Sequence, residues 1–527
     1  LKPVCSRMCE SISMSLVQRH AQQPLPGLQN KASHVHAKQS LSSAKLLLPA
    51  VGSTAGVLCH KKRLPQPSHY EGRRVGSGPR FSRVSCASRG GDADLGAGAK
   101  EASVREVEAT TLRDNFSAMC FWLSLNHGVV TTPVGVASSL LGAEVASTGN
   151  GVLYVCSVLS SLVLAAPATA SLGPRGALIV AMLCYSFYTF CFAIACAQPS
   201  GDDVQWLSFL LGSTCAGFGA GLLWTGQGVY FNTTAAEVAA AEELPKDNIT
   251  AGLASSFAFI YLGLEVGSKL GFSLLQLAEL DPQNIAAFYA LVGVGSVAMI
   301  GGVRDLRPPS AANVDPLSKL SSAISLWSDP KLWLLAPCNL LFGFSAAYMN
   351  GYINGSFAAV ELGKSSVAFL GAVTALVAAI LAKTVFEPLA DSSAGKGSAL
   401  FVGSVSLFLI PASVVLSGGC NGWGYGLLIL YLFQGSGRAV YESTNKAVFS
   451  DFFPDEKAEG AFANCFLQSS LAFAACFFLQ ASTSPYTLGS IVAFLAILTP
   501  IGYGVASSLR EATASNQLES GNDGKQG

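Results

Sequence analysis

Two oppositely charged side chains lie within one apolar stretch of the sequence. Glu265 and Lys269 are four positions apart, with the acid first, inside residues 250–277. At helical spacing they share a face and can pair. An unpaired ionised group at mid-bilayer costs about 2.5–3.5 kcal/mol on insertion scales. Two roles are open: a self-neutralising structural pair, or a pair that gates or couples the passage of a solute.

A second polar stripe follows Arg438 in residues 422–445. Tyr441, Glu442 and Asn445 come three, four and seven positions later, which predicts one helix face. The guanidinium offers a rigid fork of donors for an anionic group. The alternative is an Arg438–Glu442 pair that closes the helix bundle near one end.

Aromatic and amide side chains form a matching stripe in residues 205–231. Trp224, Gln227 and Tyr230 recur at helical spacing. Trp and Tyr also mark membrane interfaces, but an amide gains nothing by facing lipid. The pattern therefore favours a cavity wall.

One histidine and several amides complete the set of candidate solute-binding or coupling residues. His127, beside Asn126, is the only histidine outside the N-terminal region, and its ordinary pKa is near neutrality. Proton coupling is one hypothesis, and helix packing is the more common role of a lone histidine. Asn350 and Asn354, four residues apart, either bind a polar solute or hold helices together.

Composition decides what must position these groups. The 527 residues are 50% hydrophobic and 12% charged, against roughly 25% charged in soluble proteins, which excludes an ordinary soluble enzyme. The net charge is zero, and the apolar body carries no basic stripe, so nucleic-acid binding is not expected. With a single histidine in the body, we expect no histidine-based metal site, no cofactor and no Ser/His/Asp catalytic set.

Apolar stretches of about 20 residues, enough to cross a bilayer as a helix, recur from Asn115 onward. We predict twelve: 115–138, 150–170, 175–196, 205–231, 250–277, 284–303, 331–354, 363–384, 398–417, 422–445, 460–480 and 486–508. They form two six-helix bundles, 115–303 and 331–508, joined by a loop at 304–330 and followed by a disordered tail at 509–527. The predicted fold is an all-α membrane protein with pseudo-symmetric halves.

Basic residues orient these segments, because loops on the cytosolic side are enriched in Lys and Arg. With the N-terminus inside, the outside loops hold only Lys364. The inside loops and termini hold the others, of which Lys383 and Arg438 fall within helix ends: Arg105, Arg113, Arg175, Lys246, Arg304, Arg307, Lys319, Lys331, Lys383, Lys396, Arg438, Lys446, Lys457 and Arg510.

Residues 1–100 differ from the rest. The first 90 residues hold 14 basic residues and two acids, with abundant Ser and Pro. This composition is typical of a transit peptide, and Arg83-Val84-Ser85-Cys86-Ala87 predicts cleavage after Cys86. We therefore predict a disordered extension that directs the protein to a plastid envelope or thylakoid membrane. The alternatives are a disordered cytoplasmic tail and location in the plasma membrane or endomembranes.

The two halves echo one another. Pro167-Ala168-Thr169-Ala170 and Gly173-Pro174-Arg175 correspond to Pro388-Leu389-Ala390-Asp391 and Gly395-Lys396. The segment 388–396 resembles the loop signature of the major facilitator superfamily, in which an acid and a base pin neighbouring helix ends. That resemblance implies the major facilitator fold and a gating loop of Arg175, Asp391 and Lys396, with Ala170 replacing the acid in the first copy.

A narrower resemblance is to UNC-93-like proteins. It rests on Leu222-Leu223-Trp224-Thr225-Gly226-Gln227-Gly228-Val229-Tyr230, on Phe452-Phe453-Pro454, and on Glu459 with Ala461-Phe462-Ala463-Asn464. Residues 437–445 depart from the family pattern. The resemblance implies either solute transport or, as in some animal relatives, regulation or trafficking of other membrane proteins.

Together these features predict a facilitator that moves a small polar or anionic solute by alternating access, with proton coupling left open. The expected route runs between the halves, lined by segments 1, 4, 5, 7, 8, 10 and 11. The expected partners are the lipid bilayer and the solute, and in the alternative function another membrane protein.

Overall fold

The computed structural model describes residues 92–306, 321, 323–454 and 457–523, and these residues form helices without a strand. The predicted transit peptide, with its cleavage site, lies outside the described residues apart from positions 92–100, which begin the first helix. The first bundle consists of α2 (Asp92–Leu140), α3 (Ala143–Leu159), η3 (Ser160–Leu164), α4 (Ala165–Ala197), α5 (Asp203–Glu242), α6 (Lys246–Leu277) and α7 (Pro282–Ile300).

The second bundle follows the central loop, of which residues 307–320 and 322 are not described. It begins after the short turn η5 (Leu326–Ser328). Its elements are α9 (Pro330–Tyr348), η6 (Met349–Ala358), α10 (Ala359–Glu361), α11 (Lys364–Leu381), η7 (Ala382–Phe386), α12 (Glu387–Asp391), α13 (Gly395–Leu416), η8 (Gly424–Leu427), α14 (Leu428–Val440), η9 (Tyr441–Asn445), α15 (Lys446–Phe452), α16 (Lys457–Gln480) and α17 (Pro485–Asp523).

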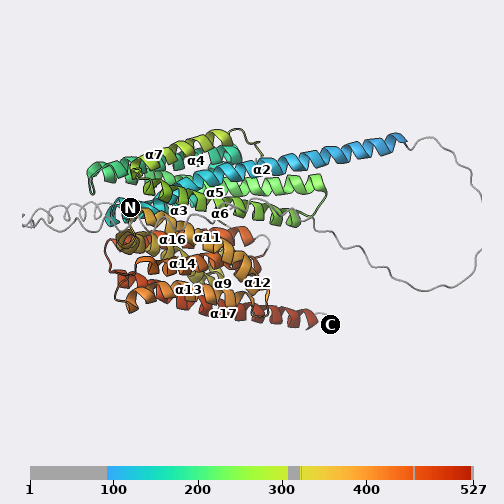
Figure 1. Ribbon diagram of the computed structural model, residues 1–527. Helices are drawn as coiled ribbons and strands as arrows, with labels where there is room; N and C mark the ends of the chain where they lie inside the picture. Colours follow the sequence, from blue (N-terminus) through green and yellow to red (C-terminus); the bar gives the residue numbers. More distant parts are fainter. Residues whose placement is uncertain (1–91, 307–320, 322, 455–456, 524–527) are drawn as a thin grey trace, which may run out of the picture. The chain divides into compact units, whose positions relative to one another are not determined.

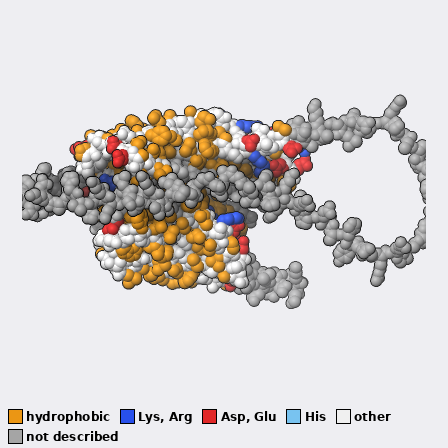
Figure 2. Space-filling view, in the orientation of Figure 1, with side chains coloured by type: hydrophobic (Ala, Val, Ile, Leu, Met, Phe, Trp, Pro, Cys, Tyr) orange, Lys and Arg blue, Asp and Glu red, His pale blue; other side chains and the backbone are white. Residues whose placement is uncertain are grey.

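The helices account for most of the predicted membrane segments. In the described part of the chain, nine helices are long and apolar enough to cross a membrane. One of them, Ala143–Ala197, covers two predicted segments and each of the other eight covers one, so ten of the twelve are represented. The remaining two, 115–138 and 422–445, lie in α2 and in the η8–α15 stretch, and their crossing stays a prediction. Hydrophobic side chains cover most of the visible face in Figure 2, and charged groups gather toward its ends.

The two bundles repeat one packing pattern. In the first, α2 packs against α6 and α7, and α4 against α5 and α7. In the second, α9 packs against α16 and α17, and α13 against α14 and α17, so each element has its counterpart six segments later. The bundles meet where α6 packs on α11, α3 on α16, and α2 on η6. Figure 1 shows the first bundle in blue to yellow-green and the second in yellow to red.

The two ends of the bundles take their names from the predicted orientation of the chain, with its N-terminus inside. The inside end is where the membrane part of α2 begins and α5 ends, and the outside end is where α2 ends and α3 begins. Beyond the inside end α2 extends past its neighbours (Figure 1). Also at the inside end, α17 continues to Asp523, so residues 509–523, expected as a disordered tail, are helical.

Local breaks shape several helices. Gly173 has φ of 75° and is followed by Pro174, which separates two helices within Ala165–Ala197; glycine tolerates this conformation and proline suits the first turn of the next helix. The segments η3, η6, η7 and η9 are π-helical. A π turn inserts an extra residue and rotates the helix face beyond it, and such turns are frequent at functional sites.

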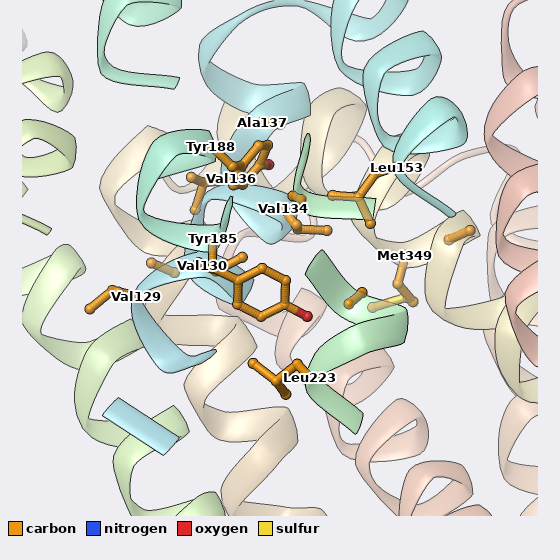
Figure 3. Packing of buried hydrophobic residues seen from close by; sticks show 14 of the residues in the cluster. Val129, Val130, Val134, Val136, Ala137, Leu153, Tyr185, Tyr188, Leu223 and Met349 are labelled. Carbon is orange, nitrogen blue, oxygen red and sulfur yellow. The ribbon is translucent and has the colours of Figure 1, made fainter. Parts of the chain in front are cut away.

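A continuous apolar core holds the first bundle together. Val130 of α2, Tyr185 of α4 and Leu223 of α5 lie in one buried cluster, and Met349 of η6 joins it from the second bundle. Figure 3 shows these side chains converging between the helices. This apolar packing therefore fixes the positions of α2, α4 and α5 relative to one another.

Candidate functional site: a charge cluster between the bundles

The best-defined polar feature joins the two bundles. Glu265 of α6 accepts a hydrogen bond from Lys269 Nζ at 2.6 Å, as the four-residue spacing predicts. Its two oxygens also accept from the two terminal guanidinium nitrogens of Arg438, on α14, at 2.8 and 2.7 Å. The side chain of Glu265 is 3% exposed, and those of Lys269 and Arg438 are each 14% exposed.

This cluster lies midway along its helices. Arg438 is midway along the helical stretch 424–452, and Glu265 lies well within α6. Lys269 also faces the second bundle, because a Cβ added at Gly371 of α11 would lie 3.5 Å from the Lys269 Cδ atom. One carboxylate thus serves two cations, and the three groups sum to a net charge of +1.

Close helix packing brings Arg438 to this place. A Cβ at Gly435 would lie 2.8 Å from Val377 Cβ and 2.9 Å from the carbonyl oxygen of Thr374, so only glycine lets α14 approach α11 this closely. Ser406 and Ser436 bond at 3.0 Å and hold α14 to α13. Since α11 also packs on α6, these contacts place the Arg438 guanidinium next to the first bundle.

The side chains of the stripe predicted after Arg438 bond to different partners. Tyr441 donates to Ser469 Oγ at 3.1 Å. Glu442 pairs with Lys446 at 2.7 Å rather than with Arg438. The π-helical turn Tyr441–Asn445 explains the difference, because it rotates the positions after Arg438 away from the face expected for a regular helix.

His127 lies in an aromatic surround beside the cluster. Its ring is 5.3 Å from the Trp224 ring, 5.1 Å from Tyr261 and 5.9 Å from Tyr185, centre to centre. The residue is 7% exposed, and its Nδ1 atom has no hydrogen-bond partner among the described residues. Tyr261 is four residues before Glu265, so His127 and Trp224 lie one helical turn toward the inside end from the charges.

The asparagines hold helices together. The Asn126 amide nitrogen lies 3.1 Å from both the Gly293 carbonyl and Ser296 Oγ of α7, and 3.2 Å from Ser186 Oγ of α4, away from the charge cluster. Asn354 donates to the Gly135 carbonyl at 2.8 Å and accepts from the Tyr431 hydroxyl at 2.6 Å.

The outside end is latched by such bonds between bundles. Asn354 ties η6 to α2, and Ser138 donates to the Asn350 carbonyl at 2.6 Å. Ser273 of α6 donates to the Ser365 carbonyl of α11 at 2.5 Å. We call these three contacts the outside latch.

Several polar contacts between described residues at the inside end join residues of the same bundle. Arg113 and Glu242 form two bonds at 2.9 and 3.0 Å in the first bundle. In the expected gating loop, Arg175 donates to the Val303 carbonyl at 3.0 Å, and Lys396 pairs with Asp451 at 2.5 Å. Asp391, the acid expected to pin this loop, is exposed and is not the residue that pairs with Lys396.

The two remaining candidates on α5, Tyr230 and Gln227, differ in their hydrogen bonding. The Tyr230 hydroxyl donates to the Arg304 carbonyl at 2.9 Å and accepts from the Asn115 amide, so it pins the inside ends of α2 and α7. Gln227 is half-buried, and no hydrogen bond to it is found in the described part of the chain. Of the stripe, Trp224 is the residue that contacts the groups around His127.

Comparisons with known proteins concern the family likeness and the fold. No family model matches the chain. It is 24% identical over 461 residues to protein unc-93 homolog A of Bos taurus, covering 76% of this chain and 96% of that protein. It is also 24% identical over 395 residues to UNC93-like protein 3 of Arabidopsis thaliana, covering 69% and 79%.

Solved structures share the fold. The nucleoside transporter NupG matches with a TM-score of 0.53 at 13% identity, covering 75% of this chain and 99% of that one. A D-xylose-proton symporter matches with a TM-score of 0.55 at 11% identity, covering 75% and 97%. The chain is similar to UNC-93 proteins over most of its length and shares the fold of these transporters.

In this UNC-93-like chain the partner of Arg438 could not be found from helical spacing, because Glu265 lies 173 positions away. Tyr261 and Phe257 were also missed. Their signal was present, since Phe257, Tyr261, Glu265 and Lys269 recur at intervals of four. Among the described residues, no group of three or more His, Cys, Asp or Glu side chains is placed to hold a metal ion.

A cleft of about 560 Å³ lies elsewhere, at the inside end between α2 and α5. Its charged walls include the Arg113–Glu242 and Arg105–Glu243 pairs. Because these charges neutralise one another and lie far from the centre, we place the candidate site at the charge cluster instead.

Proposed function

We propose that this UNC-93-like protein is a transporter that moves a small polar or anionic solute across a membrane by alternating access. The observation that carries the proposal is the Glu265–Arg438 bond, which joins the two bundles at mid-depth. Ionisable groups within a membrane are expensive and mark solute or ion pathways. Transporters with this repeat architecture bind solutes at mid-depth between their repeats.

The distribution of contacts supports an inward-facing state. The outside latch bonds the bundles together, whereas Arg113–Glu242 and Lys396–Asp451 at the inside end each remain within one bundle. Most residues of α6 from 252 to 259, between its inside end and the charge cluster, are exposed. A solute would then reach the charge cluster from the inside end, and rocking of the bundles would open the other side.

Proton coupling is the proposed energy source. A proton on Glu265 releases Lys269 and Arg438, and both cations then lack a counter-ion unless an anionic solute replaces the carboxylate. The unbonded Nδ1 atom of His127 is the second group that we propose takes part in the coupling. One neighbour in fold is a D-xylose-proton symporter.

Uptake by purified full-length protein in proteoliposomes tests the proposal. A panel of sugars, nucleosides, amino acids, carboxylates and inorganic anions is offered with and without an imposed pH gradient. We expect uptake of one class, stimulated by an inward proton gradient and reduced at least tenfold by Arg438→Gln. The control is Lys383→Gln, because Lys383 forms a similar i,i+4 pair with Glu387 but its side chain is 77% exposed.

The alternative function is a non-transporting subunit that regulates or traffics another membrane protein, and similarity to unc-93 homologs is compatible with it. Absence of uptake for every class, together with a stable membrane-protein partner on purification from native membranes, would favour that function. Residence in a plastid membrane also remains a proposal, which rests on the composition of residues 1–100.

A further inference from the structure

The spare positive charge of the cluster indicates what a solute must bring. Glu265 neutralises one of its two cations, so Lys269 and Arg438 together leave one unit of charge uncompensated. An anionic group entering beside them relieves that imbalance, and a guanidinium suits carboxylate, sulfonate or phosphate oxygens. A cationic solute would be repelled.

Aromatic rings extend the site from these charges toward the inside end. Phe257 and Tyr261 lie on the same face of α6 as Glu265, and their rings stack at 5.5 Å. Trp224 of α5 lies 5.9 Å from Tyr261 at 66°, an edge-to-face arrangement. All three residues are half-buried. Tyr261 lies on the same helix face as Glu265, and its ring contacts His127 and Trp224 of the first bundle.

The second bundle presents rings at a comparable place. Tyr441 follows Arg438 by three positions and stacks on Phe342 of α9 at 3.9 Å and 9°. Both rings are half-buried. Phe473 of α16 lies 6.0 Å from Phe342 and stacks on Tyr154 of α3 at 4.3 Å, so this second set spans the two bundles, whereas the first set lies within the first bundle.

From this juxtaposition we infer that the solute is an organic anion with a planar ring. Its anionic group contacts Lys269 and Arg438, and its ring lies against Trp224 and Tyr261. Ring stacking contributes about 0.5–1.5 kcal/mol beyond the burial of apolar surface. The charged group sets the orientation of the bound solute. The inference deepens the proposed function and rests on it for the claim that the bound molecule is transported.

Four small probes separate ring from charge. Benzenesulfonate has both, benzenesulfonamide has the ring without the charge, methanesulfonate has the charge without the ring, and benzyltrimethylammonium has a ring with the opposite charge. Binding to full-length protein in detergent is measured as the rise in melting temperature with probe concentration, because a ligand of the native state stabilises it. We expect benzenesulfonate to bind at least tenfold more tightly than each of the other three.

Matched variants locate the site. Lys269→Gln and Trp224→Leu should each weaken benzenesulfonate binding at least tenfold, whereas Lys269→Arg and Trp224→Phe should restore most of it. Lys383→Gln is the control for the charge. Trp206→Leu is the control for the ring, since Trp206 is on the same helix near the outside end. Both controls should bind as the unmodified protein does.

Each outcome decides the inference. Equal binding of methanesulfonate, of benzenesulfonamide or of benzyltrimethylammonium, binding insensitive to both Lys269→Gln and Trp224→Leu, or no binding of benzenesulfonate would overturn it. Uptake of radiolabelled benzenesulfonate by proteoliposomes tests transport separately. Binding of benzenesulfonate without uptake supports the inferred ligand and counts against the proposed transport. Uptake of a sugar or a cation through the same site supports transport and counts against the inferred ligand.

Discussion

Replacement of the shared carboxylate should destabilise the protein more than replacement of either cation. In Glu265→Gln, Lys269 and Arg438 keep their charges without a counter-ion, and one uncompensated buried charge already costs about 3–5 kcal/mol. In Arg438→Gln the neutral Glu265–Lys269 pair survives, and two charge-assisted hydrogen bonds are lost. The guanidinium also no longer has to be desolvated, so the net loss of folding free energy is about 1.5–3 kcal/mol. Lys269→Gln removes one bond and leaves the two-bond Arg438 pair, so we expect about 1 kcal/mol.

The assay follows from the buried thiols. Cys120, Cys338, Cys465 and Cys476 are all buried, so a dye that fluoresces on reaction with cysteine reports the loss of native packing during heating. Melting temperatures should fall in the order Lys269→Gln, Arg438→Gln, Glu265→Gln, with the largest loss last. The Glu265→Gln/Arg438→Gln double variant should lose less than the sum of the single losses by about 2 kcal/mol, because the residues are in contact. Additive losses, or a larger loss in Arg438→Gln than in Glu265→Gln, would refute the shared-carboxylate arrangement.

Three further predictions concern packing and location. Asn126→Ala should lower the free energy of unfolding by about 1–3 kcal/mol, since it leaves buried acceptors on α4 and α7 unsatisfied. The control Asn232→Ala, at an exposed position, should change this free energy little. Equal melting temperatures of the two variants would contradict the role of Asn126. Gly217→Ala should sharply reduce the yield of folded protein, because its methyl would collide with the Leu153 carbonyl of α3, and Gly228→Ala on the same helix, where a Cβ meets nothing within 4 Å, should stabilise by about 0.5–1 kcal/mol. A fluorescent fusion of residues 1–100 should enter plastids and be shortened near Cys86 on a gel, and a cytosolic signal of full size would remove the plastid proposal.

The sequence was informative wherever a local rule governs the structure. Hydropathy located the segments, and i,i+4 spacing identified the Glu265–Lys269 pair. Contacts between bundles were not accessible in this way. The pairing of Arg438 with Glu265 depends on how α14 approaches α6, and glycine packing against α11 determines that approach.

Two kinds of candidate show the limit of helical spacing. Asn126 and His127 are adjacent in an apolar stretch, yet one bonds α4 and α7 while the other lies among aromatic rings near the charges. Spacing alone does not reveal which neighbour each side chain faces. The stripe beginning at Arg438 failed for a different reason, because its π-helical turn changes the angle between successive side chains.

Alternating access is tested most directly by distances at both ends of the bundles. Spin labels at Leu244 and Thr384 report the inside end, one on each bundle, and labels at Asp203 and Leu416 report the outside end; all four positions are exposed. Asn354→Ala weakens the outside latch without touching either pair of labels. We predict that this substitution adds longer distances to the outside pair and shorter distances to the inside pair in the same preparation. An outside pair that lengthens while the inside pair stays unchanged, or two pairs that both stay unchanged, would contradict a carrier that rocks about the Glu265–Arg438 bond.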